Sequence, residues 1–361
     1  MALLPLSKAF TAPAIGVFWN NYKQTTGEAP YLGAGFFPKL KRATMDLKWF
    51  KGSKGLPVSL TPSNYDALAT VRDRIGFKEM ETEMPFFRES YIVKEKDAQE
   101  YENFMNAVDP SVGMQILNQI MLGPTDLIMG ANVVPERMIW QLLAPTDGAP
   151  KIAIEANGVK YDYNYDVDGS YKTNNFLELA DATDKWTDTT NSNPYEDLRT
   201  AQKTMQKKRG TKPSVAVMND TTFQLIVKNE KIHGYLLAQN PTANIMVDDA
   251  YVKAFLQRQL GLTIVIYDKM YKKEDGTEAT FIPDNMVTLL PGMMSLGNTY
   301  YGKTPEERTG VMAPGNLSIV ETGVSVYRYA TPHPINEICI VSEIVLPSYE
   351  RMDDTYVIKV A

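Results

Sequence analysis

From Pro194 to Leu290 the chain alternates between helix-like and strand-like stretches, and this alternation constrains the fold more than any other feature. The helix-like stretches cover 195–209, 220–228 and 249–260, and the strand-like stretches cover 214–218, 262–267 and 286–290. Gly210 and Gly261 stand where a left-handed residue commonly ends a helix. The pattern therefore predicts a compact α/β unit within residues 191–330.

Two helical pieces are expected upstream of this unit. An apolar residue recurs at every fourth position from Val112 to Ile120, which is a helical period. Gly123-Pro124 is expected to break this helix, because proline lacks an amide hydrogen and its ring clashes with the preceding turn. A second helix is expected with Pro135 in its first turn, where the missing amide hydrogen costs nothing.

Strand pairs are expected on both sides of the α/β unit. Apolar alternation on either side of Asn157-Gly158 predicts a β-hairpin, because this dipeptide favours a two-residue turn. Two further strands, 337–346 and 355–360, are expected to pair with each other and close the chain.

The first 45 residues follow no sustained period, yet they are rich in aromatic side chains. Such a segment must bury this apolar surface, either on its own chain or on a neighbour. Residues 1–54 also hold eight Lys or Arg against two acids, a net +6, so the other 307 residues carry −12. An extended basic arm suits nucleic acid or the acidic surface of an adjacent subunit, and a plain solvated surface is the alternative.

Three carboxylates, Glu79, Glu81 and Glu83, alternate with other residues and so share one face of a predicted strand. A metal site is one interpretation, and an edge that faces solvent or a basic partner is the favoured one. Residues 164–169 match the front half of a calcium-binding loop, but the twelfth position is Asn175 instead of Glu. The sequence therefore predicts no metal and no cofactor.

Catalytic chemistry has few candidate side chains in this sequence. The chain has one cysteine, Cys339, within an apolar run that indicates a buried strand, and two histidines, His233 and His333. No phosphate-binding loop, dinucleotide fingerprint or nucleophile elbow is found. The sequence predicts a protein that is not an enzyme, with an α/β hydrolase as the less favoured alternative.

The composition is that of a globular protein, with 44% hydrophobic and 22% charged residues. No run approaches the roughly 18 to 20 apolar residues that cross a bilayer. The first residues lack the basic start and apolar centre of a signal peptide. We therefore expect folding in a cytoplasm.

Three stretches in the second half of the chain carry a family resemblance. They are Glu136-Arg137 through Lys151-Ile152, then Phe281-Ile282-Pro283-Asp284-Asn285 with Leu296-Gly297-Asn298-Thr299, and finally Ile338–Leu346 with Tyr356-Val357-Ile358-Lys359-Val360. Their order resembles the major capsid protein of lambda-type tailed phages, which has the Hong Kong 97 capsid fold. The resemblance is patchy and covers roughly residues 95–361.

The resemblance implies an α+β architecture with four parts. Residues 1–45 would be an N-terminal arm and 46–93 an extended β loop. Residues 94–190 and 331–361 would form the peripheral domain, with a spine helix near 125–144, and 191–330 would form the axial domain.

The resemblance also implies a function in the virion. The protein would self-assemble as pentamers and hexamers into the icosahedral head shell that encloses phage double-stranded DNA, and it would be assembled in the host bacterial cytoplasm. It implies a separate scaffolding protein, a portal, a decoration protein and non-specific contact with DNA, without a membrane. A nanocompartment shell protein of the encapsulin type is the alternative.

Aromatic and charged residues near the N-terminus are the predicted contacts between subunits. Apolar burial would stabilise the contact, while exposed ion pairs, worth about 0–1 kcal/mol each, would orient it. The apolar anchors are Phe36, Phe37, Trp49 and Phe50. The predicted cations are Lys39, Lys41, Arg42, Lys51 and Lys54, facing Glu79, Glu81 and Glu83 of another copy.

Overall fold

The computed structural model describes residues 5–27, 30–44, 46–51, 78–105, 110–156, 158–238, 248–308 and 316–361. The chain divides into two compact units, each built from separated stretches of sequence. The first unit comprises 1–48, 81–137 and 298–348, and the second comprises 49–80, 138–297 and 349–361. Helices and strands occur in both units, which confirms the predicted α+β class.

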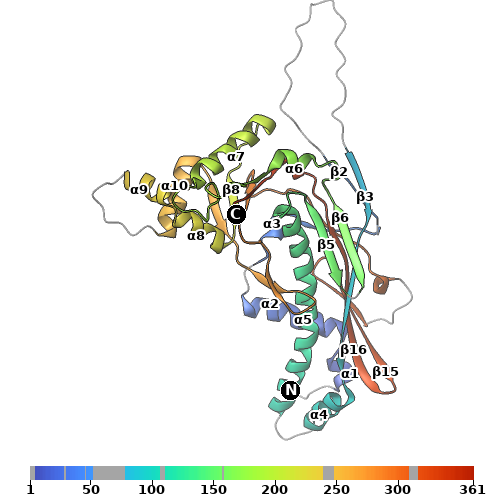
Figure 1. The fold of residues 1–361 in the computed structure, drawn as a ribbon. Helices are drawn as coiled ribbons and strands as arrows, with labels where there is room; N and C mark the ends of the chain where they lie inside the picture. The colour runs from blue at the N-terminus through green and yellow to red at the C-terminus, as the bar shows by residue number, and fades with distance from the viewer. Residues whose placement is uncertain are drawn as a thin grey trace, which may run out of the picture. The chain divides into compact units, whose positions relative to one another are not determined.

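A six-stranded sheet organises the first unit, with β15 and β16 as its longest pair (Figure 1). Its strands are β1 (Lys39–Lys41), β4 (Phe86–Val93), β13 (Thr299–Tyr301), β14 (Leu317–Val320), β15 (Val324–Pro332) and β16 (Ile335–Pro347). β16 pairs antiparallel with β15, β4 and β13, so it is an interior strand. β1 lies parallel to β13 at one edge of the sheet.

Four helices of the first unit precede residue 110. They are α1 (Leu6–Ala9), α2 (Ala12–Thr26), α3 (Gly33–Phe36) and, after β4, α4 (Glu95–Met105). α2 begins after Thr11, whose Oγ1 accepts the Ala14 amide hydrogen at 3.3 Å, and it ends at the left-handed Gly27. α2 packs against β14 and β15.

The N-terminal segment supplies much of the first unit's core. Leu6, Phe10, Ile15 and Trp19 are at most 5% exposed and pack in one cluster with residues of α4, α5, β15 and β16. The interpretation that this segment follows no sustained period is therefore wrong for α2, where Ala12, Ile15 and Trp19 recur at a helical spacing. Its own chain already covers these side chains.

A long helix, α5 (Pro110–Leu143), runs without a break and contains both Pro124 and Pro135 (Figure 1). The predicted break at Gly123-Pro124 is therefore wrong. A proline inside a helix costs about 3 kcal/mol, but burial of one helix face stabilises long helices more than propensity does. Ile128 and Pro135 on this helix are buried.

Gly123 marks a close contact and not a helix end. A Cβ atom at this position would lie 2.4 Å from Cε2 of Tyr91 on β4. The helix therefore approaches β4 more closely than any residue larger than glycine allows. Here the requirement for glycine comes from tertiary packing, which the local sequence does not reveal.

A mixed five-stranded sheet organises the second unit, in the order β7-β17-β12-β8-β9. Its strands are β7 (Phe176–Glu178), β8 (Val215–Met218), β9 (Thr263–Ile266), β12 (Met286–Leu290) and β17 (Tyr356–Lys359). β8 and β9 are parallel, whereas β12 is antiparallel to both β8 and β17.

Helices pack around this sheet, and in Figure 1 α7, α8 and α10 lie beside β8. The helices are α6 (Ser170–Asn175), α7 (Pro194–Arg209), α8 (Asp220–Val227), α9 (Glu230–Ala238) and α10 (Asp249–Leu260). Gly210 and Gly261 are left-handed, with φ of 75° and 67°. The predicted α/β alternation is confirmed here, helix ends included.

The last two strands do not pair with each other, contrary to prediction. β16 lies in the first unit's sheet, whereas β17 pairs with β12 and β7 in the second. Both runs are mostly apolar and largely buried, so their sequences do not distinguish one partner strand from another. β13, β14 and β15 also join the first unit, although the predicted axial range 191–330 includes most of their residues.

Three two-stranded ribbons complete the described strands. They are β2 (Asp46–Lys51) with β3 (Lys78–Glu83), β5 (Lys151–Ala156) with β6 (Val159–Asn164), and β10 (Met270–Lys272) with β11 (Glu278–Thr280). The β5–β6 ribbon confirms the hairpin predicted around Asn157-Gly158. Two short 3-10 helices, η1 (Pro305–Glu307) and η2 (Met352–Asp354), follow β13 and precede β17.

Candidate functional site

Three predicted contact cations, Lys39, Lys41 and Arg42, lie on β1 or directly after it. Lys41 Nζ forms an ion pair with Glu307 Oε2 at 2.6 Å. The Arg42 guanidinium lies 4.3 Å from the centre of the Tyr300 ring, which is a cation–π contact. These cations bind the first unit of their own chain, and this binding anchors β1 at the sheet edge.

Lys39 belongs to a buried polar cluster between β1, α5 and the sheet. Its Nζ donates to Asn132 Oδ1 at 3.0 Å and lies 5.8 Å from the centre of the Tyr301 ring. Burial lowers the pKa of Lys39, although nearby carboxylates, Glu321 and Glu343, oppose this effect. Lys39 is thus a structural cation, and its surroundings also include buried carboxyl groups.

Glu343 is the most unusual member of this cluster. It lies on β16 and is 1% exposed, in line with the buried Val341 and Val345 on the same strand face. Neither carboxylate oxygen has a hydrogen-bond partner among the described residues. Burial raises the pKa of Glu343 well above its ordinary value, with only partial opposition from Lys39. Burial therefore favours the protonated form of this carboxyl group.

Glu306 on η1 is also buried, but it is fully paired. Its Oε1 lies 2.5 Å from the Arg88 guanidinium, and its Oε2 accepts a 2.7 Å hydrogen bond from Ser342. The neighbouring Glu307 completes a capping box with Thr304. Sequence reasoning missed this site, although Thr304-Pro-Glu-Glu is a recognisable capping signal.

The predicted apolar anchors are covered within the chain where their side chains are described. Phe36 and Phe37 are both 0% exposed. Trp49 is 5% exposed, and its ring centre lies 5.3 Å from that of Tyr165 within the second unit. The side chain of Phe50 lies outside the described residues.

The remaining predicted charges belong to the β2–β3 ribbon and the segment between these strands. Lys51 ends β2, and Glu79 and Glu81 lie on β3, where only the backbone is described. Glu83, at the end of β3, is exposed. Lys54 lies outside the described residues. The pairing of β2 with β3 brings the acidic strand beside the strand that carries Lys51.

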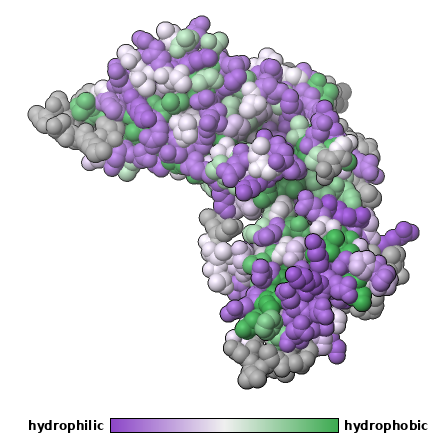
Figure 2. Space-filling view, turned by 60° about the horizontal axis from the view of Figure 1, so that its bottom comes forward, coloured by the Kyte–Doolittle hydropathy of each residue, from purple (hydrophilic) through white to green (hydrophobic). Residues whose placement is uncertain are grey.

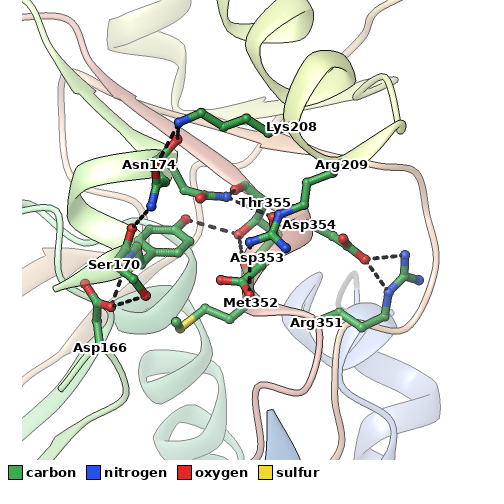
Figure 3. Close-up of polar contacts among 12 residues, drawn as sticks. Asp166, Ser170, Asn174, Lys208, Arg209, Arg351, Met352, Asp353, Asp354 and Thr355 are labelled. Atoms are coloured by element: carbon green, nitrogen blue, oxygen red, sulfur yellow. Dashed lines mark hydrogen bonds and ion pairs between the residues drawn. The ribbon is translucent and has the colours of Figure 1, made fainter. Parts of the chain in front are cut away.

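A polar cluster fastens the C-terminal segment to α6 and α7 in the second unit (Figure 3). Arg209 at the end of α7 forms an ion pair with Asp353 at 3.1 Å. Asn175 Nδ2 donates to the backbone oxygens of Asp353 and Thr355 at 2.9 and 2.6 Å. The Tyr171 and Thr355 hydroxyl groups share a 3.1 Å hydrogen bond. These contacts position η2 directly before β17 enters the sheet.

The loop that resembles a calcium site serves as a helix cap. Asp166 accepts the amide hydrogens of Tyr171 at 2.8 Å and Lys172 at 3.0 Å, so its carboxylate is used by α6 (Figure 3). Among the described residues, no three His, Cys, Asp or Glu side chains gather as a metal site requires.

Nucleophilic chemistry at Cys339 is disfavoured by its surroundings. The thiol is 0% exposed, and burial raises its pKa to about 12, so it stays protonated at neutral pH. His233 Nε2 is hydrogen bonded to the Val227 carbonyl oxygen at 2.6 Å. None of the described helices is both long enough and apolar enough to cross a membrane.

The surface shown in Figure 2 has small hydrophobic patches among hydrophilic side chains. One exposed helix face in the first unit is unusual because it lacks charge: residues 110–125 of α5 contain no Lys, Arg, Asp or Glu. Met114 and Leu122 on this stretch are 46% and 39% exposed. Uncharged surface with methionine is typical of protein interfaces.

The sequence matches one family model, and no curated protein matches it. The family is described as phage major capsid protein E, and its model matches residues 20–316, which is more than half of the chain.

Solved structures with the same fold cover almost the whole chain. The putative capsid protein of a prophage of Escherichia coli CFT073 is 15% identical with a TM-score of 0.58, and the match covers 98% of this chain and 99% of that one. A phage-related protein of Bordetella bronchiseptica RB50 is 15% identical with a TM-score of 0.53, over 97% and 96%. A chain of the cyanophage A-1(L) capsid is 12% identical with a TM-score of 0.50, over 92% of each.

Proposed function

The chain belongs to the phage major capsid protein E family and is a capsid shell protein, and on this premise we propose that it tiles an icosahedral head as pentamers and hexamers around double-stranded DNA. The observation that carries the proposal is the family match over residues 20–316. The Hong Kong 97-like fold over nearly the full length supports it. The protein acts as a structural component of the virion and not as an enzyme.

We propose the following roles for the parts of the chain. Residues 1–45 form the arm, 46–93 the loop that reaches an adjacent subunit, and 191–330 the axial domain. Residues 94–190 and 331–361 form the peripheral domain. The pairing of β13, β14 and β15 with β16 supports an extension of the peripheral sheet to include those three strands.

We propose that the predicted contact between subunits is made chiefly by the β2–β3 ribbon. Lys39, Lys41 and Arg42 have binding partners in their own unit, which favours Lys51 and Lys54 as the cations that meet a neighbour. Glu79, Glu81 and Glu83 would be their acceptors on another copy. The uncharged face of α5 offers apolar area, because obligate interfaces need more than ion pairs.

We also propose the partners of the shell. A separate scaffolding protein guides assembly in the host cytoplasm, a portal occupies one vertex, and a decoration protein binds the finished head. Contact with the packaged DNA is weak and non-specific; the net charge of −6 disfavours strong binding to the DNA phosphates overall.

Negative-stain electron microscopy of the purified protein, co-expressed with and without its scaffolding protein, tests the proposal. We expect closed icosahedral particles. A uniform monomer under all conditions would contradict it, and closed particles that load a protein cargo in place of DNA would indicate a nanocompartment.

A charge-reversal pair tests the ribbon contact. Glu83→Lys should reduce particle yield, because Glu83 is exposed at the end of β3. Glu155→Lys, a like change near the end of β5, is the control. Equal particle yields from both variants would place the contact elsewhere.

A further inference from the structure

Two helices of the second unit end in cations at the same edge of its sheet. α7 leads into β8 and α10 leads into β9, and these two strands are parallel neighbours. Parallel strands start at the same edge of a sheet, so the C-terminal ends of both helices converge there. The contacts agree: Gln202 Nε2 and Lys212 Nζ both donate to the Leu260 carbonyl oxygen, at 3.3 and 2.7 Å.

The sequence around this junction is strongly one-sided in charge. Residues 198–219 contain six Lys or Arg and no acid, and 250–267 contain two and no acid. We define the basic patch as Lys203, Lys207, Lys208, Arg209, Lys212 and Arg258. Within the patch, Arg209 forms an ion pair with Asp353 (Figure 3).

Part of the basic patch has a purely structural explanation. Lys208 Nζ donates to the Asn174 carbonyl oxygen at 3.1 Å, and Lys212 caps α10 through Leu260. Cations at the C-terminal end of a helix also stabilise its dipole. The contacts account for Lys208 and Lys212. The helix dipole favours Lys207, Lys208, Arg209 and Arg258, which lie in the last turns of α7 and α10.

Lys203 lies outside the last turn of α7, and Lys207 has no bonded partner among the described residues although it lies within that turn. Both are exposed, and neither forms a hydrogen bond or ion pair with any residue that the structure describes. They are four residues apart on one face of α7, about 6 Å along the helix, where like charges repel each other. An external anion that contacted both lysines would relieve this repulsion.

The chemistry of the patch favours nucleic acid over a second protein. Its exposed neighbours are polar, such as Gln206, Thr211 and Gln257, and no large hydrophobic side chain is exposed within 198–213 or 256–263. A stable protein contact needs an apolar centre, whereas phosphate contacts need only positioned cations.

We infer that the basic patch binds the sugar-phosphate backbone of double-stranded DNA, and hence that this edge of the second unit faces the lumen of the shell. The inference rests on the proposed function, since the shell encloses the DNA. Binding is independent of base sequence, because the patch has no aromatic or amide array aimed at base edges.

The test is fluorescence anisotropy with a mixed-sequence DNA duplex of about 30 base pairs and the unassembled full-length protein. We expect the double variant Lys203→Glu with Lys207→Glu to bind at least about tenfold more weakly at low salt. The slope of log affinity against log salt should fall by about two, since each lost phosphate contact removes about 0.9. Arginine at both positions should preserve binding.

Lys272→Glu with Lys273→Glu is the matched control, with the same change in charge at two exposed positions of the second unit. β10 follows the far end of β9, so these lysines are separated from the patch by the length of that strand. Equal losses in both double variants would reduce the effect to net charge and overturn the inference.

Two other results would also overturn it. The first is wild-type protein that does not bind the duplex at low salt. The second is a patch variant that keeps its DNA affinity but no longer self-associates, which would assign the patch to a second copy of the chain. Particle formation is scored separately in the same preparations, so shells without DNA affinity would refute this inference and leave the proposed function intact.

Discussion

At the scale of single residues, two buried glutamates in the first unit show how partners decide the effect of a charge. Glu306 is 4% exposed and is satisfied by Arg88 and Ser342, whereas Glu343 is 1% exposed and has no hydrogen-bond partner among the described residues. An unsatisfied buried polar group costs about 1–3 kcal/mol. Glu343 therefore lowers the free energy of unfolding of the first unit relative to an apolar side chain at the same position.

This difference predicts a specific pH dependence. Because the folded pKa of Glu343 is raised, its protonated form favours the folded state, and that contribution is complete below the unfolded pKa of about 4.3. It is lost as the pH rises toward the folded value. Glu343→Gln should flatten the fall in unfolding free energy that begins as the pH rises above the unfolded pKa, measured by urea denaturation.

Glu343→Met should go further and stabilise the unassembled chain by about 1–3 kcal/mol at neutral pH, because it fills the space without a polar group. Glu306→Gln is the control and should destabilise, since it weakens the pair with Arg88. If wild type and Glu343→Gln lost stability in parallel over the whole pH range, another group would be responsible.

At this scale the sequence predicted the chemical character of side chains but not their burial or their partners. The sequence indicated which side chains were charged or aromatic, but not that Phe36 and Phe37 were internal or that Lys41 paired with Glu307, 266 positions away. Such pairs depend on strand neighbours, β1 beside β13, which no local pattern specifies.

At the scale of elements, the helices of the second unit were predictable because their ends carry local signals. Asn219 accepts the Thr222 amide hydrogen at 2.9 Å, and Asp248 accepts that of Tyr251 at 2.9 Å. α5 was not predictable, because its continuity through two prolines depends on the surfaces packed against it. Likewise, the strand ranges near the C-terminus were found, while their partners were not.

Two glycines on α5 provide a test of this packing. Gly123→Ala should destabilise by about 1–3 kcal/mol, because the new methyl group meets the Tyr91 ring. Gly130→Ala should stabilise by about 0.5–1 kcal/mol, because its Cβ position has no atom within 4 Å and alanine favours the helix. Thermal unfolding of the two variants measures both effects. Equal changes would show that α5 does not press on β4.

At the scale of the whole molecule, the N-terminal segment has an observed role in the chain's own core and a proposed role in contacts with neighbouring subunits. An experiment has to distinguish these two roles. Deletion of residues 1–45 would not test the second role alone, because it would also remove Leu6, Phe10, Ile15 and Trp19 from the core. Point changes on α2 distinguish the roles more cleanly.

Ile15 and Val17 lie two positions apart on α2 and are 0% and 61% exposed. Ile15→Ala should cost about 2–5 kcal/mol in the unassembled chain, the usual cost of a core truncation. Val17→Ala should change that stability by less than about 0.5 kcal/mol. If Val17 contacts a neighbour, its variant should instead lower particle yield, measured by sedimentation. Similar thermal shifts in both variants would refute the assignment of α2 to the chain's own core.

The interior positions of β16 and β17 have a consequence for biosynthesis. β16 lies between β15 and β4, and β17 lies between β7 and β12, yet both come from residues 335–359. All the strands that flank β16 and β17 are translated before residue 335. Until then, each sheet lacks the strand that joins its two parts. Each sheet is complete only after its interior strand has been translated, so we expect assembly to wait until residues 335–359 have been synthesised.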